Sequence, residues 1–131
     1  MALSTVSLSF FSLKIKLMIM LNVGTGLLGQ ELQKYIKLVA PSHSELDITK
    51  PTVFDALGPI PELIVHCAAF TDLVRAEYEK ELCYQTNVIG TRNVASLGIN
   101  IIYISTEYVF DGMKGNYAEE DYPNPQNFYA F

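Results

Sequence analysis

A glycine-rich turn between two ordered segments constrains the fold more than any other feature of this chain. The residues before it, 16–23, form a largely apolar run that is typical of a strand buried on both faces of a parallel sheet. The turn itself, residues 24–29, has the spacing G-x-G-x-x-G, and residues 27–37 show helical apolar spacing. A strand, a glycine turn and a helix in this order predict the start of a βαβ unit.

The rest of the chain continues the alternation of strands and helices. Further strands are predicted at residues 38–40, 63–67 and 100–104. A short helix is predicted from Pro51 to a point before Gly58, and a long one over residues 73–96. After residue 107 the sequence is rich in turn residues. This order predicts an α/β fold of the Rossmann type, a doubly wound parallel sheet with right-handed crossovers, over residues 16–131.

The glycine turn also predicts a ligand. Gly24, Gly26 and Gly29 would let the backbone turn tightly and approach a pyrophosphate, at a helix N-terminus that offers N–H groups and a partial positive charge. A glycine-rich turn without a ligand is the alternative. The turn therefore favours a dinucleotide-binding domain.

The choice between NAD and NADP stays open at this point. An acidic residue about 20 residues after the glycine turn would bind the ribose hydroxyls, and both Glu45 and Asp47 have suitable spacing. Ser42 and His43, at the predicted strand tip, are neutral, which leans the prediction towards NADP.

Composition excludes several other classes. The net charge is −5 and the sequence has no basic stripe, so a nucleic-acid binder is not expected. Residues 1–15 lack a positive region before their apolar run and are too short to span a bilayer; we expect a disordered extension, with a weak signal peptide as the alternative. His43 and His66 lack neighbouring ligands, so no metal site is expected. Cys67 and Cys83 are interpreted as reduced thiols of a cytoplasmic protein.

Five segments in a fixed order carry a resemblance to a known family. They are the glycine turn and residues 46–49 (LDIT), 66–72 (HCAAFTD), 87–93 (NVIGTRN) and 105–112 (STEYVFDG). Together they resemble an extended short-chain dehydrogenase/reductase, and more closely the dTDP-4-dehydrorhamnose reductase family. The resemblance covers the cofactor-binding part of that family, and we expect the chain to end before the C-terminal substrate-binding part.

The resemblance implies roles for individual residues. Gly26, Leu27 and Leu28 would contact the pyrophosphate, Asp47 and Ile48 would bracket the adenine, and Ala68, Ala69, Phe70 and Thr71 would line the nicotinamide side. Ser42, at the predicted strand tip, is a further candidate for cofactor binding. Thr106 would hydrogen-bond the substrate carbonyl, and Tyr129 would donate a proton to the developing alkoxide. The implied reaction is NAD(P)H-dependent reduction of a 4-keto nucleotide sugar to dTDP-L-rhamnose, for surface polysaccharide synthesis.

Simpler structural roles compete with these assignments. Asp47 could cap the following helix, Thr106 could bond local backbone at a strand end, and Tyr129 could be an ordinary aromatic residue. Ala68 and Ala69 could be small only to let a helix approach. For Asn87 we expect a bond across a helix to the backbone and no catalytic role.

The sequence departs from the family pattern at three points. Val23 stands where the family usually has the first glycine, and Glu107 stands where it usually has Asp. The family's lysine, four residues after Tyr129, would fall beyond Phe131, so we expect little activity from the chain alone. The alternatives are a non-catalytic dinucleotide-binding regulatory subunit, like the one that partners methionine adenosyltransferase, and a truncated reading frame. A homo-oligomer or a partner subunit is possible, and no membrane association is expected.

Overall fold

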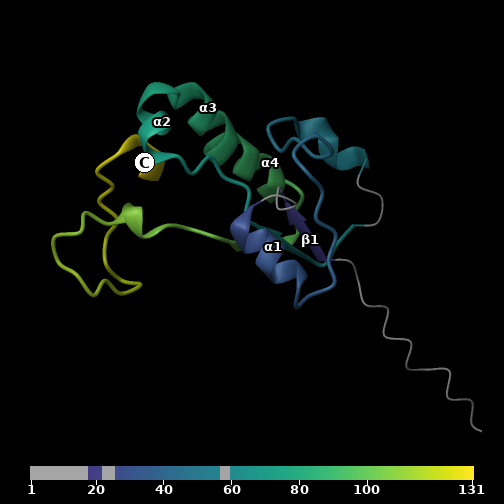
Figure 1. Cartoon of the computed structure of the whole chain (residues 1–131), viewed down its shortest axis with the longest axis horizontal. Helices are drawn as coiled ribbons and strands as arrows, with labels where there is room; N and C mark the ends of the chain where they lie inside the picture. Colours follow the sequence, from purple (N-terminus) through teal and green to yellow (C-terminus); the bar gives the residue numbers. More distant parts are fainter. Residues whose placement is uncertain (1–17, 22–25, 57–59) are drawn as a thin grey trace, which may run out of the picture.

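A three-stranded parallel sheet forms the centre of the molecule. The computed structural model describes residues 18–21, 26–56 and 60–131 of the chain. Strands β1 (Met18–Leu21), β2 (Leu63–His66) and β3 (Asn100–Tyr103) pair in the order β1-β2-β3 (Figure 1). In register, Ile19 lies opposite Ile64, and Ile64 lies opposite Ile101. The predicted extension at residues 1–15 and Gly24 lie outside the described residues.

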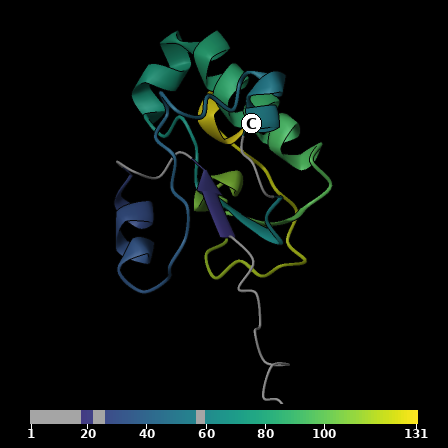
Figure 2. The same cartoon turned by 90° about the vertical axis from the view of Figure 1, so that its right-hand side faces the viewer.

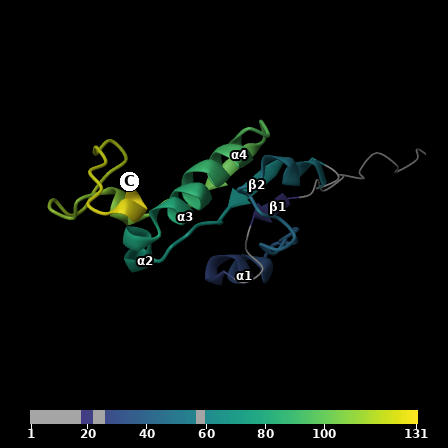
Figure 3. The same cartoon turned by 90° about the horizontal axis from the view of Figure 1, so that it is seen from above.

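Helical segments cover both faces of this sheet, as the alternating sequence predicts. Helix α1 (Leu27–Gln33) lies on one side, and α3 (Lys80–Tyr84), the π-helical segment η2 (Gln85–Gly90) and α4 (Thr91–Ala95) follow one another on the other side (Figures 2 and 3). Successive side chains of β2 point to opposite faces: Val65 packs with Leu32 of α1, and Ile64 packs with Val94 of α4. The doubly wound arrangement is therefore confirmed.

The main core lies between β2 and α4. Its buried members are Leu46, Ile48, Ile64, Ala68 and Val94, with Leu97, Ile99 and Ile101 packed against them. Burying a side chain of this size stabilises the fold by roughly 1.5–3 kcal/mol. Two of the members come from the loop before β2, so this loop is fixed against the sheet.

Two predicted elements near the N-terminal side are shorter than the sequence indicates. Helix α1 ends at Gln33, because the N–H groups of Lys34 and Tyr35 turn back to carbonyls three residues earlier and tighten the chain. The strand predicted at 38–40 is reduced to an isolated bridge at Val39, and Pro41, which has no N–H to donate, follows it closely. The predicted helix after residue 50 is the 3₁₀ segment η1 (Pro51–Ala56).

The helical stretch predicted over residues 73–96 is present over most of its length, but it is interrupted at Glu79. Helix α2 (Leu73–Tyr78) begins at its cap Asp72 and stops at Glu79, whose φ of −105° and ψ of 47° leave the helical region. The chain then continues through α3, η2 and α4. No Pro or Gly marks the break, and its effect is to direct α2 towards the C-terminal segment.

The C-terminal segment, residues 104–131, is built differently from the sheet. It contains only two short 3₁₀ turns, η3 (Glu107–Val109) and η4 (Phe128–Ala130), joined by an extended loop (Figure 1). It returns to the helical layer at α2, which contacts η4. Within the described part of the chain, no helix combines the length and apolar character needed to cross a membrane.

Candidate active site

A cleft of about 370 Å³ opens at the carboxyl ends of β2 and β3, above the start of α1. This is the edge of a parallel sheet where ligands of doubly wound folds bind. The predicted site residues that line it are Gly26, Leu27, Leu28, Gly29, Ala69, Thr71 and Tyr129. Residues from three separate parts of the sequence therefore meet in one place.

A second cavity of about 210 Å³ adjoins the cleft. Both are lined by Ala69, Ser105 and Tyr129, and the second is also lined by Thr106 and Asn87. The structure thus brings Thr106 and Tyr129, which are 23 positions apart in the sequence, to the same cavity.

The start of α1 presents backbone N–H groups to the cleft. Gly26 is the N-cap, with an extended φ of −77° and ψ of 144°, and no side chain caps the helix there. The first N–H groups of a helix lack intrahelical partners and carry partial positive charge. Leu27 is 90% exposed, so the mouth of the cleft is open at this point. The arrangement fits an anionic group such as a pyrophosphate.

The loop after β2 forms the opposite wall. Asn87 receives the N–H of Phe70 on its Oδ1 at 2.7 Å and donates its Nδ2 to the Phe70 carbonyl at 3.0 Å. These two bonds confirm the backbone-binding role expected for Asn87. Ala68 is buried in the core, whereas Ala69 and Thr71 are exposed at the cleft. Asn87 therefore fixes the course of the wall that Ala69 and Thr71 provide.

The candidate adenine side, residues 42–49, is held by local hydrogen bonds. Glu45 accepts bonds from the Ser42 hydroxyl at 2.7 Å and the Ser42 N–H at 2.8 Å, and these bonds lower the pKa of Glu45. The carboxylate of Asp47 accepts from the Thr49 hydroxyl at 2.7 Å, which lowers the pKa of Asp47. The carboxylate of Glu45 therefore lies at Ser42, at the strand tip that we expected to be neutral from the sequence.

Ile48 has its side chain in the core and not in the cleft. The Nδ2 of Asn93 donates to the Ile48 carbonyl at 2.9 Å, and both residues are buried. Gly90 leaves room for this packing, because a Cβ at position 90 would lie 2.6 Å from Cδ1 of Ile48. Sequence reasoning missed Gly90 and Asn93 as supports of this loop; a glycine inside a predicted helix is the signal that could have found them.

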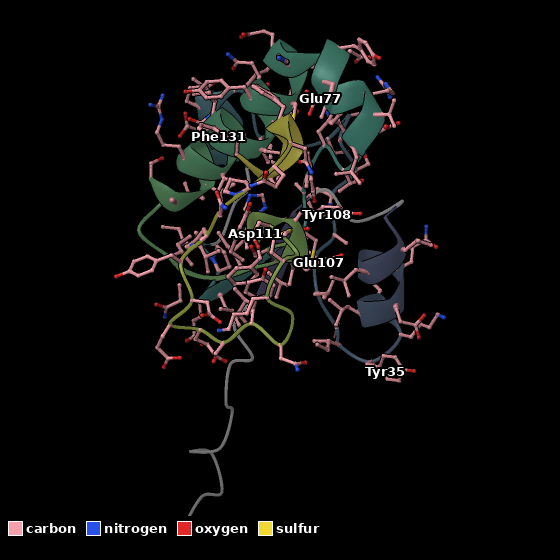
Figure 4. All side chains as sticks on the ribbon, turned by 90° about the vertical axis from the view of Figure 1, so that its left-hand side faces the viewer. Tyr35, Glu77, Glu107, Tyr108, Asp111 and Phe131 are labelled. Carbon is pink, nitrogen blue, oxygen red and sulfur yellow. The ribbon has the colours of Figure 1, made fainter. Side chains whose placement is uncertain are left out.

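Thr106 and Tyr129 are positioned by short-range contacts. Thr106 Oγ1 accepts the Tyr108 N–H at 3.3 Å and caps η3, and it lies 3.4 Å from Oε2 of Glu107. The ring of Tyr129 lies edge-to-face with that of Tyr108, with centroids 6.3 Å apart. Figure 4 shows Glu107 and Tyr108 together where the C-terminal segment leaves the sheet. Thr106 therefore makes the local backbone hydrogen bond that was considered as its structural role, and it also lines the second cavity.

Asp111 organises the loop that joins η3 to η4. Its carboxylate accepts hydrogen bonds from the Tyr117 hydroxyl, from the Met113 N–H at 2.9 Å and from Asn124 Nδ2 at 2.9 Å. These bonds, led by the Tyr117 hydroxyl, lower the pKa of Asp111 to about 2. The loop is also closed by the Asn124 N–H, which donates to the Val109 carbonyl at 2.8 Å. Sequence reasoning did not single out Asp111 for this role.

His66 lies at the end of β2, beneath the site. Its side chain is 1% exposed, its Nε2 is 2.9 Å from Thr91 Oγ1, and burial lowers its pKa to about 4. His66 is therefore neutral near pH 7 and structural. Cys67 borders the cleft, and burial raises the pKa of its thiol. No cluster of metal-ligating side chains occurs among the residues whose placement is given.

Comparison with known proteins identifies the family. A family model described as "RmlD substrate binding domain" matches residues 17–131. The chain belongs to this family. Among its relatives, dTDP-4-dehydrorhamnose reductase of Aggregatibacter actinomycetemcomitans is 37% identical over 118 residues, which cover 80% of this chain and 40% of the relative. The predicted resemblance to dTDP-4-dehydrorhamnose reductases is thereby confirmed.

Other family comparisons bear on the fold and on a second function. The structure of dTDP-4-dehydrorhamnose reductase from Bacillus anthracis in complex with NADP matches with a TM-score of 0.81 and 35% identity, covering 88% of this chain and 45% of that one. This likeness confirms the Rossmann-type fold. Methionine adenosyltransferase 2 subunit beta of Bos taurus is 44% identical over 74 residues, or 53% of this chain and 22% of the relative. The RmlD-family chain thus spans less than half the length of these relatives.

Proposed function

We propose that this RmlD-family chain forms the dinucleotide-binding part of a dTDP-4-dehydrorhamnose reductase, which reduces dTDP-4-dehydrorhamnose to dTDP-L-rhamnose with NADPH or NADH. The observation that carries the proposal is the meeting of the glycine turn, Thr106 and Tyr129 around two adjoining cavities. The likeness to the B. anthracis reductase, solved with NADP, supports the cofactor class.

The residues fit distinct roles in this reaction. The nicotinamide would supply a hydride to the substrate carbonyl carbon. Thr106 would donate a hydrogen bond to the carbonyl oxygen, and the Tyr129 hydroxyl would give that oxygen its proton, a type of step that contributes about 10²–10⁴-fold to a rate. The N–H groups at Gly26 and Leu27 would hold the pyrophosphate. We place the nicotinamide beside Ala69 and Thr71, which line the same cleft.

Cofactor binding can be tested on the 131-residue chain with a single substitution. Gly26→Asp places a carboxylate at the N-cap of α1, where Asp is a favourable capping residue, so the helix should be kept. The same carboxylate would repel a pyrophosphate, and NADPH affinity measured by calorimetry should fall at least about tenfold, or about 1.4 kcal/mol.

A matched control separates this effect from a general effect of added charge. Val74→Asp adds a carboxylate at the exposed first turn of α2, outside both cavities. It should leave NADPH affinity unchanged. Equal affinities for the original chain and Gly26→Asp would refute binding at the glycine turn.

Glu45 makes the phosphate preference testable. Its carboxylate sits on Ser42, where the cofactor's ribose would lie, and would oppose a 2′-phosphate by charge repulsion. Glu45→Gln should therefore raise affinity for NADPH relative to NADH. Glu119→Gln, an exposed change outside the two cavities, is the control and should leave the ratio unchanged. An unchanged ratio in Glu45→Gln would place the ribose elsewhere.

The chain spans 40% of the A. actinomycetemcomitans reductase, so the reductase activity is tested in a longer protein. We expect the 131-residue chain to bind cofactor without appreciable turnover of dTDP-4-dehydrorhamnose. A chimera with residues 17–131 in place of the matching part of that reductase should turn over, and Tyr129→Phe should lower its kcat by about 100-fold or more. A chimera that is folded, binds NADPH and is inactive would count against the reductase proposal.

A second candidate is a non-catalytic dinucleotide-binding subunit. The 44% identity to methionine adenosyltransferase 2 subunit beta, over 74 residues, favours it. Under this proposal the chain would bind NADPH and co-purify with a methionine adenosyltransferase catalytic subunit. Cofactor binding without such an association would leave the reductase as the better explanation. A cytoplasmic location fits both candidates, because each would use the cellular nicotinamide pool.

A further inference from the structure

Tyr129 lies on a turn with little packing of its own. It is the middle residue of η4, a three-residue 3₁₀ segment in which no residue is buried. A single turn is not stable by itself in water, since nucleation of helical structure is unfavourable. The place of Tyr129 at the cavities therefore depends on contacts made by its neighbours as well as on its own ring contact with Tyr108.

One of these contacts reaches across the molecule. Oε1 of Glu77, on α2, accepts the backbone N–H of Phe128 at 2.7 Å, although the two residues are 51 positions apart. Phe128 is the first residue of η4, so the bond fixes the residue next to Tyr129. Figure 4 shows Glu77 in the helical layer beside η4. A bond from a backbone N–H to a carboxylate is stronger than one between neutral groups.

Two smaller contacts involve η4 or the residue before it. The ammonium of Lys80 lies 5.3 Å from the centroid of the Phe128 ring. The Oδ1 of Asn127 accepts the Ala130 N–H at 3.0 Å and so caps the turn internally. Among the contacts described for η4, Glu77 is therefore the side chain outside the C-terminal segment that holds its backbone.

The break in the helix at Glu79 lets the side chain of Glu77 contact η4. Helix α2 ends at Tyr78 and α3 starts at Lys80 on a new course, so α2 faces η4 while α3 and α4 follow the sheet. The cap of Asp72, which receives the Arg75 N–H at 2.9 Å, fixes the other end of α2. Glu77 is thus presented from a short helix that is anchored at its start.

We propose that Glu77 is a positioning residue for Tyr129: through the Phe128 N–H it holds η4 so that Tyr129 lines the two cavities. The catalytic consequence rests on the proposed reductase function, whereas the structural linkage does not. Truncating Glu77 would release the residue beside Tyr129 without touching the cleft itself, because Glu77 does not line it.

NMR on the 131-residue chain tests the linkage directly. In Glu77→Ala the Phe128 amide should exchange about tenfold faster or more, because it loses a hydrogen bond to a charged group. The cross-relaxation between the rings of Tyr108 and Tyr129, which lie edge-to-face at 6.3 Å, should weaken or vanish. Glu77→Gln keeps a weaker, neutral acceptor of the same length, so it should restore the ring signal and bring the exchange rate of the Phe128 amide part of the way back.

Two further variants define the outcome. Glu77→Asp is one methylene shorter and should behave like Glu77→Ala, which also provides a second test if the alanine variant folds poorly. Glu81→Ala removes a nearby exposed carboxylate that bonds Gln85 at 2.8 Å, and it should change neither signal. An unchanged Tyr108–Tyr129 signal in folded Glu77→Ala or Glu77→Asp would overturn the proposal. So would a uniform rise in exchange across the sheet that Gln fails to reverse.

The reductase chimera separates this inference from the proposed function. If the chimera is active, Glu77→Ala should lower kcat with little change in KM for NADPH, and Glu77→Gln should restore kcat. If the chimera is inactive but the NMR signals respond as described, the reductase proposal fails and the linkage stands. Loss of kcat without any change at Tyr129 would refute the positioning role.

Discussion

The two halves of the molecule are held together by different forces. Around β2 the chain is stabilised by apolar burial: Leu46, Ile64 and Val94 are almost completely buried. In residues 104–131, all of which the structure describes, no residue is fully buried. That segment is held mainly by carboxylates that accept several hydrogen bonds, above all Asp111, together with stacking of the Phe110 and Tyr117 rings. The cofactor side of the cleft thus rests on an apolar core, and the side with Thr106 and Tyr129 rests on a polar network.

This difference predicts which substitutions should destabilise the whole fold and which should have only a local effect. Apolar contacts within the core are shared by several elements, so their loss should be felt throughout the sheet. Hydrogen bonds in an exposed loop should be lost locally, because water replaces the missing partner. Four measurements test this division.

The largest effect is expected from Leu46→Ala, which removes a fully buried side chain from the core. The free energy of unfolding should fall by about 2–5 kcal/mol, measured by urea denaturation, because a cavity is left that the core cannot refill. Val74→Ala, at a residue that is 70% exposed, is the control and should cost little. Similar losses in the two variants would mean that the core does not dominate stability.

The second effect concerns His66 and pH. In the folded chain His66 resists protonation down to about pH 4, whereas an unfolded His66 takes up a proton below pH 6.5. The unfolded state therefore binds more protons in this window, and the free energy of unfolding should fall as the pH decreases from 6.5 to 4. The total is about 3 kcal/mol for this one group.

The comparison that isolates His66 uses two substitutions. His66→Gln should flatten this part of the pH dependence, measured by urea denaturation at a series of pH values. His43→Gln, at an exposed histidine, should leave it in place. If both variants keep the original slope, protonation of His66 is not what weakens the core in acid.

A smaller and local effect is expected from Asp111→Asn. The amide keeps the shape of the side chain but accepts hydrogen bonds from Tyr117 and Met113 more weakly than a carboxylate does. Exchange of the Met113 amide should become faster, while that of Val65 in β2 stays the same. Glu119→Gln serves as the exposed control. Faster exchange at Val65 in Asp111→Asn would show that the two halves are not independent.

The smallest effect is expected from Lys114→Met. Lys114 pairs with Asp121 at 2.5 Å on the surface, and exposed ion pairs are screened by salt. The variant should differ from the original only at low ionic strength, in amide exchange at Ala118, whose N–H donates to Asp121. Lys37→Met is the matched control. A difference that persists at high salt would indicate that the contact of the Lys114 ammonium with the Tyr117 ring, at 6.0 Å from its centroid, also holds the loop.

The sequence predicted the apolar half better than the polar half. Strand β2 was expected at 63–67 and lies at 63–66, and β3 was expected at 100–104 and lies at 100–103. A continuous apolar run indicates a strand that is buried on both faces, so strands of this kind can be recognised from the local sequence. The grouping of Ala69, Thr71 and Tyr129 at one cleft followed from the family resemblance, because no local pattern encodes it.

The features that the sequence missed depend on partners far along the chain. The break at Glu79 has no Pro or Gly to announce it, and helical spacing continues through it. The carboxylates of Asp111 and Glu77 look like ordinary surface acids until their donors are placed beside them. Glu45 lies three residues beyond Ser42, and only the turn of the backbone brings its charge to the strand tip.

The contact between Gly90 and Ile48 has a consequence for how relatives of this chain can diverge. Any side chain at position 90 would enter space that Ile48 fills, since even a Cβ would lie 2.6 Å from its Cδ1. Substitutions at the two positions are therefore coupled: a larger residue at 90 can be accommodated only with a smaller residue at 48. If the 42–49 loop of a relative with a smaller residue at 48 were grafted onto this chain, it would leave a void beside Gly90 unless a larger residue were introduced at 90 with it.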